Sequence, residues 1–322
     1  MTMTRAELQD AARQAFGGDG LAPDVGKSWD LVAEMGWLTM TVPEAQGGLG
    51  LDREAAGVIH TEIGRALVPG PMIAQMLVIE ALSAAEGFPE RDDLLARAMA
   101  GEIMTASLSA GDRLDCVPDA DIASHVLVVA TDHVALVPLD TATVTARDTW
   151  DKTRRLFDVT SSATGITLAT GDAAAALADR LDGQLLFALA GDSLGGASAI
   201  LDLTIEYLKV RHQFGRPLAL FQALKHRVAD MKTWLSAAEA LFWARAVDPA
   251  ASLIEIGALK AHATTLYRAI AEDAIQLHGG IGLTMEYHCH LFLKRATLNA
   301  VLGGDADHWE ARAGRHALDA AA

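Results

Sequence analysis

The chain has 322 residues, of which 51% are hydrophobic, so it can bury a sizeable core and about two domains are expected. Its 42 acidic residues outnumber 26 basic ones and give a net charge of -16. This charge opposes non-specific binding to nucleic acid or to an anionic membrane. Any anionic ligand must therefore meet a local cluster of cations.

Two cysteines, Cys116 and Cys289, are too few for a disulfide framework. The first residues lack the features of a secretory signal peptide, and no uninterrupted apolar run reaches the roughly 18 residues that span a bilayer. We therefore expect a cytoplasmic protein without a membrane span.

Three segments with different patterns follow one another along the chain. Residues 1–103 are mostly helical, with loops at the Pro- and Gly-containing residues 42–50 and 68–71. Residues 104–170 contain short β-branched runs and predict a small antiparallel unit, for example residues 125–130 and 133–138 around a turn. Residues 171–322 return to helical periodicity. We predict an N-terminal helical domain, a reduced middle β domain and a C-terminal helical domain with these bounds.

Apolar residues in the third segment recur every three or four positions, which predicts two packed helices joined near Pro217. A further helix runs from about Ala251 to the glycine-rich residues 279–282, where glycine permits a left-handed helix stop. Another helix is expected from about Glu286.

Residues 191–195 (GDSLG) match the G-x-S-x-G nucleophile elbow and follow an apolar run that is compatible with a strand. A serine hydrolase using Ser193 is therefore one interpretation. The surrounding sequence is helical, however, and supplies no alternating strands for a parallel sheet. Close approach of two helices at these glycines is the alternative that we favour.

Residues 288–290 (HCH) invite a metal-site interpretation. Helical neighbours two positions apart point in different directions, and no set of Asp or Glu completes a site. No metal is expected.

Three regions and the helical, β, helical order resemble the acyl-CoA dehydrogenase family. Residues 34–50 and 62–67 are similar to its N-terminal helical domain. The run 207–217 (YLKVRHQFGRP) with the following Gln222 resembles its R-x-x-F-G signature, and residues 276–282 (QLHGGIG) resemble its Q-x-x-G-G-x-G turn. The resemblance covers nearly the whole chain and implies a mainly α fold with a C-terminal four-helix bundle.

The family's cofactor is FAD, and the matching positions imply the residues that would hold it. A guanidinium gives a pyrophosphate charge-assisted and potentially bidentate hydrogen bonds, whereas glycine lets backbone N–H groups approach a phosphate or ribose closely. In the family these groups reach across a subunit interface and clasp the adenine-diphosphate half of the neighbour's FAD. The residues implied here are Arg211, Phe214, Gln222, Gln276, Gly279 and Gly280.

The catalytic carboxylate of the family is missing. The family places a glutamate that removes the α proton at one of two positions. One corresponds to residues 301–305 (VLGGD), with a glycine where the glutamate is expected, and the other lies near Leu185. Asp192 and Asp305 are nearby, but each is shorter and differently aimed. We assign no catalytic residue to this chain.

The middle domain also lacks the family's flavin-facing T-E-P, G-S-D and W-I-T-like segments, although residues 105–111 (TASLSAG) begin where the first is expected. These losses resemble the smaller subunit of the heterotetrameric (α2β2) acyl-CoA dehydrogenases of bacterial steroid side-chain degradation. The resemblance implies a homologous larger partner subunit that carries the glutamate and flavin pocket, and a bulky acyl-CoA substrate. Two alternatives remain. One is a self-sufficient homomeric dehydrogenase with an unrecognised base, and the other is a purely structural protein that binds neither FAD nor acyl-CoA.

Overall fold

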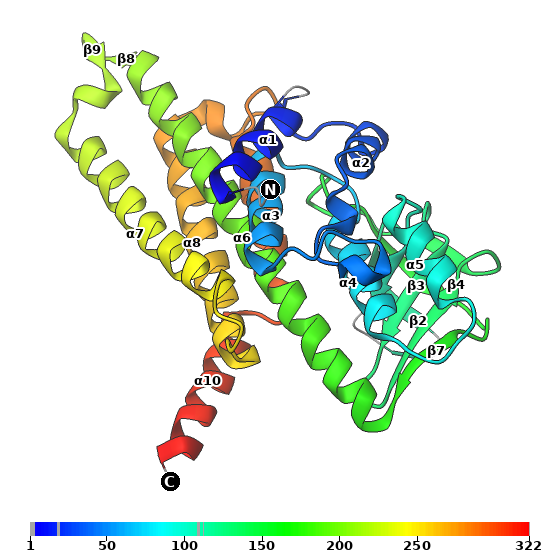
Figure 1. Ribbon diagram of the computed structural model, residues 1–322. Coiled ribbons are helices and arrows are strands. Elements are labelled where there is room, and N and C mark those ends of the chain that lie inside the picture. The colour runs from blue at the N-terminus through cyan, green and yellow to red at the C-terminus, as the bar shows by residue number, and fades with distance from the viewer. Residues whose placement is uncertain (1–3, 18–19, 108–109, 112, 322) are drawn as a thin grey trace. The chain divides into compact units, whose positions relative to one another are not determined.

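The computed structural model describes residues 4–17, 20–107, 110–111 and 113–321 (Figure 1). Helices come first, short strands follow, and long helices complete the chain, as the sequence predicts. The helices of the first segment are α1 (Arg5–Gly17), α2 (Val25–Glu34), η1 (Trp37–Thr39), η2 (Glu44–Gln46), α3 (Arg53–Ala66), α4 (Met72–Ala84) and α5 (Arg91–Met99).

The β region forms two small sheets. Strands β1 (Thr105–Ser107), β3 (His125–Val129), β4 (His133–Pro138) and β7 (Ile166–Thr170) form one sheet in the order β1-β3-β4-β7. Strands β2 (Arg113–Pro118), β5 (Thr143–Ala146) and β6 (Leu156–Thr160) form the other in the order β2-β6-β5.

The predicted hairpin of the first sheet is confirmed, because β3 and β4 pair antiparallel with Leu127 opposite Leu136. The prediction of a purely antiparallel unit is wrong, because β1 pairs parallel to β3. Strand β2 lies between them in sequence but belongs to the other sheet. The chain therefore leaves the first sheet and returns in the same direction, which a crossover connection allows.

The third segment contains α6 (Gly171–Val210), a two-stranded hairpin of β8 (His212–Gln213) and β9 (Arg216–Pro217), η3 (Leu218–Leu220) and α7 (Gln222–Ala246). It continues with α8 (Leu253–His278), η4 (Gly279–Leu283), α9 (Cys289–Val301) and α10 (Ala306–Ala321). Helix α9 starts three residues later than predicted, because the chain after α8 first forms a 3-10 helix and turns.

Helices α6, α7, α8 and α9 share one hydrophobic cluster, which agrees with the predicted C-terminal bundle. Of the helices within the described ranges, α6 alone is long and apolar enough to cross a membrane, with an 18-residue window of mean hydropathy 1.3. In this structure 83% of that window is buried inside the protein, as for the core helix of a bundle.

The chain folds into two compact units. One comprises Met1–Ala22, Gly57–Val68 and Leu186–Ala322, and the other comprises Pro23–Ala56 and Pro69–Leu185. The predicted bounds at residues 103 and 170 mark changes of secondary structure, since β1 starts at Thr105 and α6 at Gly171. The division into three domains stays a prediction.

The glycines of the GDSLG motif let two helices of the first unit touch. A Cβ on Gly195 of α6 would lie 1.8 Å from the carbonyl oxygen of Thr61 in α3. A Cβ on Gly64 of α3 would lie 1.9 Å from that of Asp192 in α6. Only glycine fits both positions, so the motif has a packing role.

Candidate functional site

The β8–β9 hairpin presents an aromatic side chain to solvent at the end of α6. Phe214 and Gly215 form its tip, and both have positive φ values, 52° and 78°. Such a turn favours Asn or Gly, and an aromatic residue there adds roughly 1–2 kcal/mol of backbone strain. Phe214 is 89% exposed. Backbone strain at an exposed residue motivates the hypothesis that this turn binds a ligand.

Arg211 follows the last residue of α6 and is exposed. Its backbone N–H donates to Tyr207, and its carbonyl accepts from Leu218, so the chain at this point is fixed on both sides. In the part of the chain that the structure describes, the Arg211 guanidinium has no ion pair. Gln222, the first residue of α7, is also exposed.

The glycine-rich turn ends α8 in a conformation that requires glycine. Gly279 has φ 65° and ψ −143°, and its N–H donates to Gln276 and Ile275. A Cβ on Gly279 or on Gly280 would meet nothing within 4 Å, so a ligand can approach this backbone closely. Gln276, in the last turn of α8, is exposed.

An aromatic contact joins the end of α6 to the end of α8. The rings of Tyr207 and His278 stack with centroids 4.3 Å apart, and the Tyr207 hydroxyl donates to the His278 carbonyl at 3.3 Å. Burial lowers the pKa of His278, whose Nδ1 lies 2.7 Å from the Ala274 carbonyl oxygen. The imidazole is therefore neutral near pH 7 and donates to that carbonyl.

The six residues predicted to bind the cofactor thus lie at one end of the bundle, where the hairpin and the start of η4 are found (Figure 1). All six are exposed. They form two groups, Arg211, Phe214 and Gln222 on the hairpin side and Gln276, Gly279 and Gly280 on the turn side. Their role in cofactor binding stays a prediction.

Ser193 cannot act as the nucleophile of an elbow. It lies inside the continuous helix α6, it is fully buried, and its hydroxyl donates to the Leu189 carbonyl at 2.7 Å. An elbow needs an exposed serine at a sharp turn between a strand and a helix. The hydrolase interpretation is therefore excluded.

The two aspartates nearest the expected base positions both have structural partners. The Asp192 carboxylate accepts hydrogen bonds from Arg295 at 3.0 Å and from Asn299 at 2.6 Å, and all three side chains are fully buried. The Asp305 carboxylate accepts from the backbone N–H of His308 at 2.9 Å, in the first turn of α10. The Asp192 carboxylate is therefore not available for proton transfer, and Asp305 caps the start of α10.

A buried lysine, which sequence reasoning missed, fixes the turn where the family glutamate is expected. The Lys260 ammonium donates to the Ala300 carbonyl at 2.9 Å and the Gly304 carbonyl at 2.5 Å. Trp309 donates to the Gly303 carbonyl at 2.8 Å. Burial lowers the pKa of Lys260 to about 8. Contacts within this chain therefore fix the turn.

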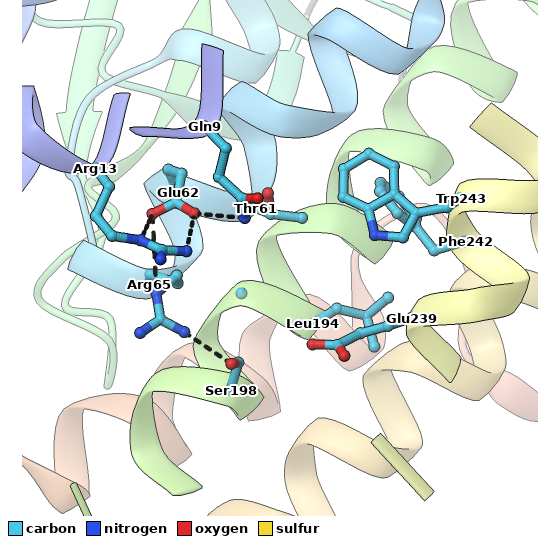
Figure 2. Close-up of a pocket in the computed structure, with 11 residues that line it drawn as sticks. Gln9, Arg13, Thr61, Glu62, Arg65, Leu194, Ser198, Glu239, Phe242 and Trp243 are labelled. Atoms are coloured by element: carbon cyan, nitrogen blue, oxygen red, sulfur yellow. Dashed lines mark hydrogen bonds and ion pairs between the residues drawn. The ribbon is translucent and has the colours of Figure 1, made fainter. Parts of the chain in front are cut away.

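A second missed feature is a charged cavity among α1, α3, α6 and α7 (Figure 2). Its volume is about 140 Å³. The buried Glu62 carboxylate accepts from Arg13 at 2.8 Å and Gln9 at 3.0 Å, and Arg65 donates to Ser198 at 2.7 Å. These contacts join residues far apart in sequence, so the sequence could not predict the cavity. Of its residues, Glu62 and Arg65 were singled out, as part of the run 62–67 that resembles the family.

Glu239 stands apart from that cluster, on the α7 side of the cavity (Figure 2). Burial raises the pKa of its carboxyl group. A half-buried carboxylate of this kind can act as a base. Ligand pockets are usually larger than about 300 Å³, however, so this cavity does not fit the reacting end of an acyl-CoA.

The HCH motif does not gather ligands. Cys289 is fully buried, and burial raises the pKa of its thiol to about 12, whereas His288 is exposed. A thiol with so high a pKa is a poor metal ligand at neutral pH. Within the described ranges, no group of three His, Cys, Asp or Glu side chains is placed to hold a metal ion.

The fold and the exposed glycine-rich turn point to a class of flavoprotein in which two helical regions flank strands. Residues 2–102 match the model of the acyl-CoA dehydrogenase N-terminal domain, and residues 187–317 match that of its C-terminal domain. The chain belongs to the acyl-CoA dehydrogenase family.

Its relatives include the acyl-CoA dehydrogenase IpdE2 of Mycolicibacterium smegmatis, which is 34% identical over 280 residues, covering 86% of this chain and 83% of the relative. The acyl-CoA dehydrogenase FadE28 of Mycobacterium tuberculosis is 28% identical, covering 90% of this chain and 93% of the relative.

Among solved structures, the Tcur3481-Tcur3483 steroid ACAD is 28% identical, with a TM-score of 0.86 and 99% of both chains covered. Butyryl-CoA dehydrogenase from Megasphaera elsdenii has a TM-score of 0.88 over 99% of both chains at 17% identity. The second likeness concerns the fold alone.

Proposed function

We propose that this chain is the FAD-clasping, non-catalytic subunit of a heteromeric acyl-CoA dehydrogenase. It would hold the adenine-diphosphate half of FAD, while a homologous partner subunit supplies the flavin pocket and the catalytic glutamate. The observation that carries the proposal is the contrast between the exposed cofactor residues at one end of the bundle and the aspartates near the expected base positions, because Asp192 is buried in an ion pair and Asp305 caps α10.

The residues at the hairpin and turn fit a dinucleotide. Arg211 can meet the pyrophosphate with its guanidinium, because it has no carboxylate partner in the described ranges. The open backbone at Gly279 and Gly280 can donate to phosphate or ribose oxygens, and the amides of Gln222 and Gln276 can add hydrogen bonds. FAD, when bound, supplies the hydride acceptor for the reaction.

In the proposed reaction, a base removes the α proton of an acyl-CoA and a hydride leaves the β carbon, which gives a trans-2-enoyl-CoA. The base would come from the partner, since Leu185 and the turn at Gly303 offer no carboxylate at the expected positions. The similar Tcur3481-Tcur3483 steroid ACAD, which combines two proteins, supports a second subunit and a steroid-type acyl group.

The second candidate is a self-sufficient homomeric dehydrogenase with Glu239 as its base. The cavity position and raised pKa of this carboxyl group favour it. The small volume of the cavity argues against it. Glu239→Gln would abolish the activity of such a homomer and would leave a partner-dependent enzyme active.

Two arginine variants in the co-expressed complex test the proposal. The chain is produced with an acyl-CoA dehydrogenase homologue encoded by a neighbouring gene, and the FAD content of the purified complex is measured by absorbance. Arg211→Ala should lower the FAD content several-fold. Arg268→Ala is the matched control, because Arg268 is an exposed arginine on α8 whose partner is Glu272. Equal FAD contents in both variants would contradict the proposal.

A further inference from the structure

Charge is distributed unevenly along this chain. Residues 209–246, which form the end of α6, the hairpin and α7, contain seven Lys or Arg but two Asp or Glu, a net charge of +5. The chain as a whole has a net charge of -16. This segment is therefore a basic region on a strongly acidic protein.

Four of its cations have no ion pair in the described part of the structure. One is Arg211, which the proposed function assigns to the pyrophosphate, and we call the other three, Arg216, Lys225 and Lys232, the basic strip. All three are exposed. Lys225 and Lys232 are seven residues apart, so they share a face of α7 and are roughly 10 Å apart along its axis. The Arg216 guanidinium lies 4.1 Å from the centroid of the Phe221 ring, which holds it beside the start of α7.

The remaining three cations of this region are neutralised locally. Lys209 pairs with Glu206 at 2.6 Å, Arg227 pairs with Asp273, and Arg245 pairs with Asp248 at 3.1 Å. The basic strip is thus the part of the segment whose charge is available to a partner.

Helix α7 is also incompletely packed. Of its 25 residues, the buried ones are Met231, Leu235, Ala238, Phe242 and Ala246. Trp234 is 54% exposed and Leu241 is 39% exposed. In Figure 1, α7 lies at the outer side of the helices α6 and α8. Tryptophan and arginine are enriched at protein interfaces, and this region exposes both, as Trp234 and Arg216.

We propose that the hairpin and α7 dock on an acidic face of the partner dehydrogenase subunit, and that the basic strip disfavours pairing of this face with a second copy of the chain. This inference rests on the proposed function and adds the chemistry of the partner. In a two-fold symmetric pair the same patch meets itself, which sets like charges against each other. An acidic face on a different subunit removes that repulsion.

One pyrophosphate is too short to contact all the cations of the basic strip. The diphosphate of one nucleotide extends over a few ångströms, whereas Lys225 and Lys232 alone span roughly 10 Å of helix. Nucleic acid is disfavoured by the net charge of -16. An extended acidic protein surface fits the spacing better.

The test compares two double variants in the complex with the co-expressed acyl-CoA dehydrogenase homologue. Lys225→Glu with Lys232→Glu reverses the strip. Lys27→Glu with Lys152→Glu makes the same change in net charge at exposed lysines outside residues 209–246. The dissociation constant is measured by analytical ultracentrifugation between about 0.05 and 0.5 M NaCl, a range over which surface charges become screened.

Reversal of the strip should raise the dissociation constant about tenfold or more at low salt, and this difference should shrink as salt rises. The control should stay within about threefold of the wild type, and Lys225→Gln with Lys232→Gln should fall between. Equal effects of the two charge reversals would overturn the inference. It would also be overturned if the wild-type chain formed homo-oligomers that reversal of the strip disrupts, or if it bound DNA and reversal of the strip abolished that binding.

Failure of the proposed function is a separate result. If the wild-type chain forms no complex with the dehydrogenase homologue at any salt concentration, the heteromeric function itself fails. If the complex forms but does not respond to strip reversal, only the docking inference fails. Thermal unfolding of each variant, followed by circular dichroism, confirms that the chain is folded.

Discussion

Asp192 and Arg295 form an ion pair with 3.0 Å between carboxylate and guanidinium, and both side chains are fully buried. Arg295 also donates to the carbonyls of Leu67 and Val68 at 3.3 Å, just after α3. The pair therefore joins α9, α6 and the segment after α3 within one compact unit. A carboxylate held in this way stabilises the fold and does not exchange protons with a substrate.

Asp192→Ala should lower the free energy of unfolding of the lone chain by about 3–5 kcal/mol, because it leaves the Arg295 guanidinium buried without its counter-charge. Urea unfolding measures this loss. Asp202→Ala is the matched control, since Asp202 pairs with Arg65 at 3.0 Å but is 56% exposed, and its loss should be below about 1 kcal/mol. Losses of equal size would contradict the structural role of Asp192.

Lys260 should make stability depend on pH in alkaline solution. Its pKa is about 8 in the folded chain and 10.5 ordinarily, so between these values the unfolded chain binds a proton that the folded chain has released. Stability then rises with pH across this window, because the unfolded state binds more protons. The unfolding free energy of the wild type minus that of Lys260→Met should increase from pH 8 to 10.5. A constant difference would refute the prediction.

Gly279→Ala should destabilise the chain by about 1–3 kcal/mol, although a Cβ there meets nothing within 4 Å. The cause is backbone conformation, since φ 65° with ψ −143° is accessible only to glycine. A Cβ on Gly280 also meets nothing within 4 Å, and Gly280→Ala should lower the unfolding free energy by less than about 1 kcal/mol. Thermal unfolding distinguishes the two variants. Equal costs would mean that the turn conformation is not fixed.

Phe214→Asn should raise the stability of the lone chain by about 1 kcal/mol, because asparagine tolerates the left-handed conformation at φ 52° better than an aromatic residue. The same change should reduce FAD retention in the complex, measured as flavin absorbance after gel filtration. Phe221→Asn is the control, because it removes the neighbouring ring, which packs on Arg216, and leaves residues 214 and 215 of the turn unchanged. A variant that is stabilised and retains FAD fully would show that Phe214 has no binding role.

The order of helices and strands could be predicted because each segment carries its own local period. Helix α8 reads as amphipathic in sequence and stops where Gly279 allows the chain to leave the helix. The pairing of β1 with β3 could not be predicted in the same way, since strand order depends on contacts between residues about 20 positions apart. The sequence contains no local signal for such a partner.

The cofactor residues were reached through resemblance, and the structure adds where they lie. That Arg211 and Gly279 end neighbouring helices follows from the Tyr207–His278 stacking, which joins residues 71 positions apart. The buried partners of Asp192 and the cavity near Glu239 are likewise long-range. Sequence patterns report which face of a helix is apolar, but they do not report which buried polar groups meet.

The FAD content and the dehydrogenase activity of the chain, alone and with its partner, test the central claim most directly. A colourless, inactive lone chain and a yellow, active mixed complex with one FAD per heterodimer are the results that the non-catalytic, cofactor-clasping role predicts. A yellow, active homo-oligomer of this chain alone would contradict it and would direct attention to Glu239 as a hidden base.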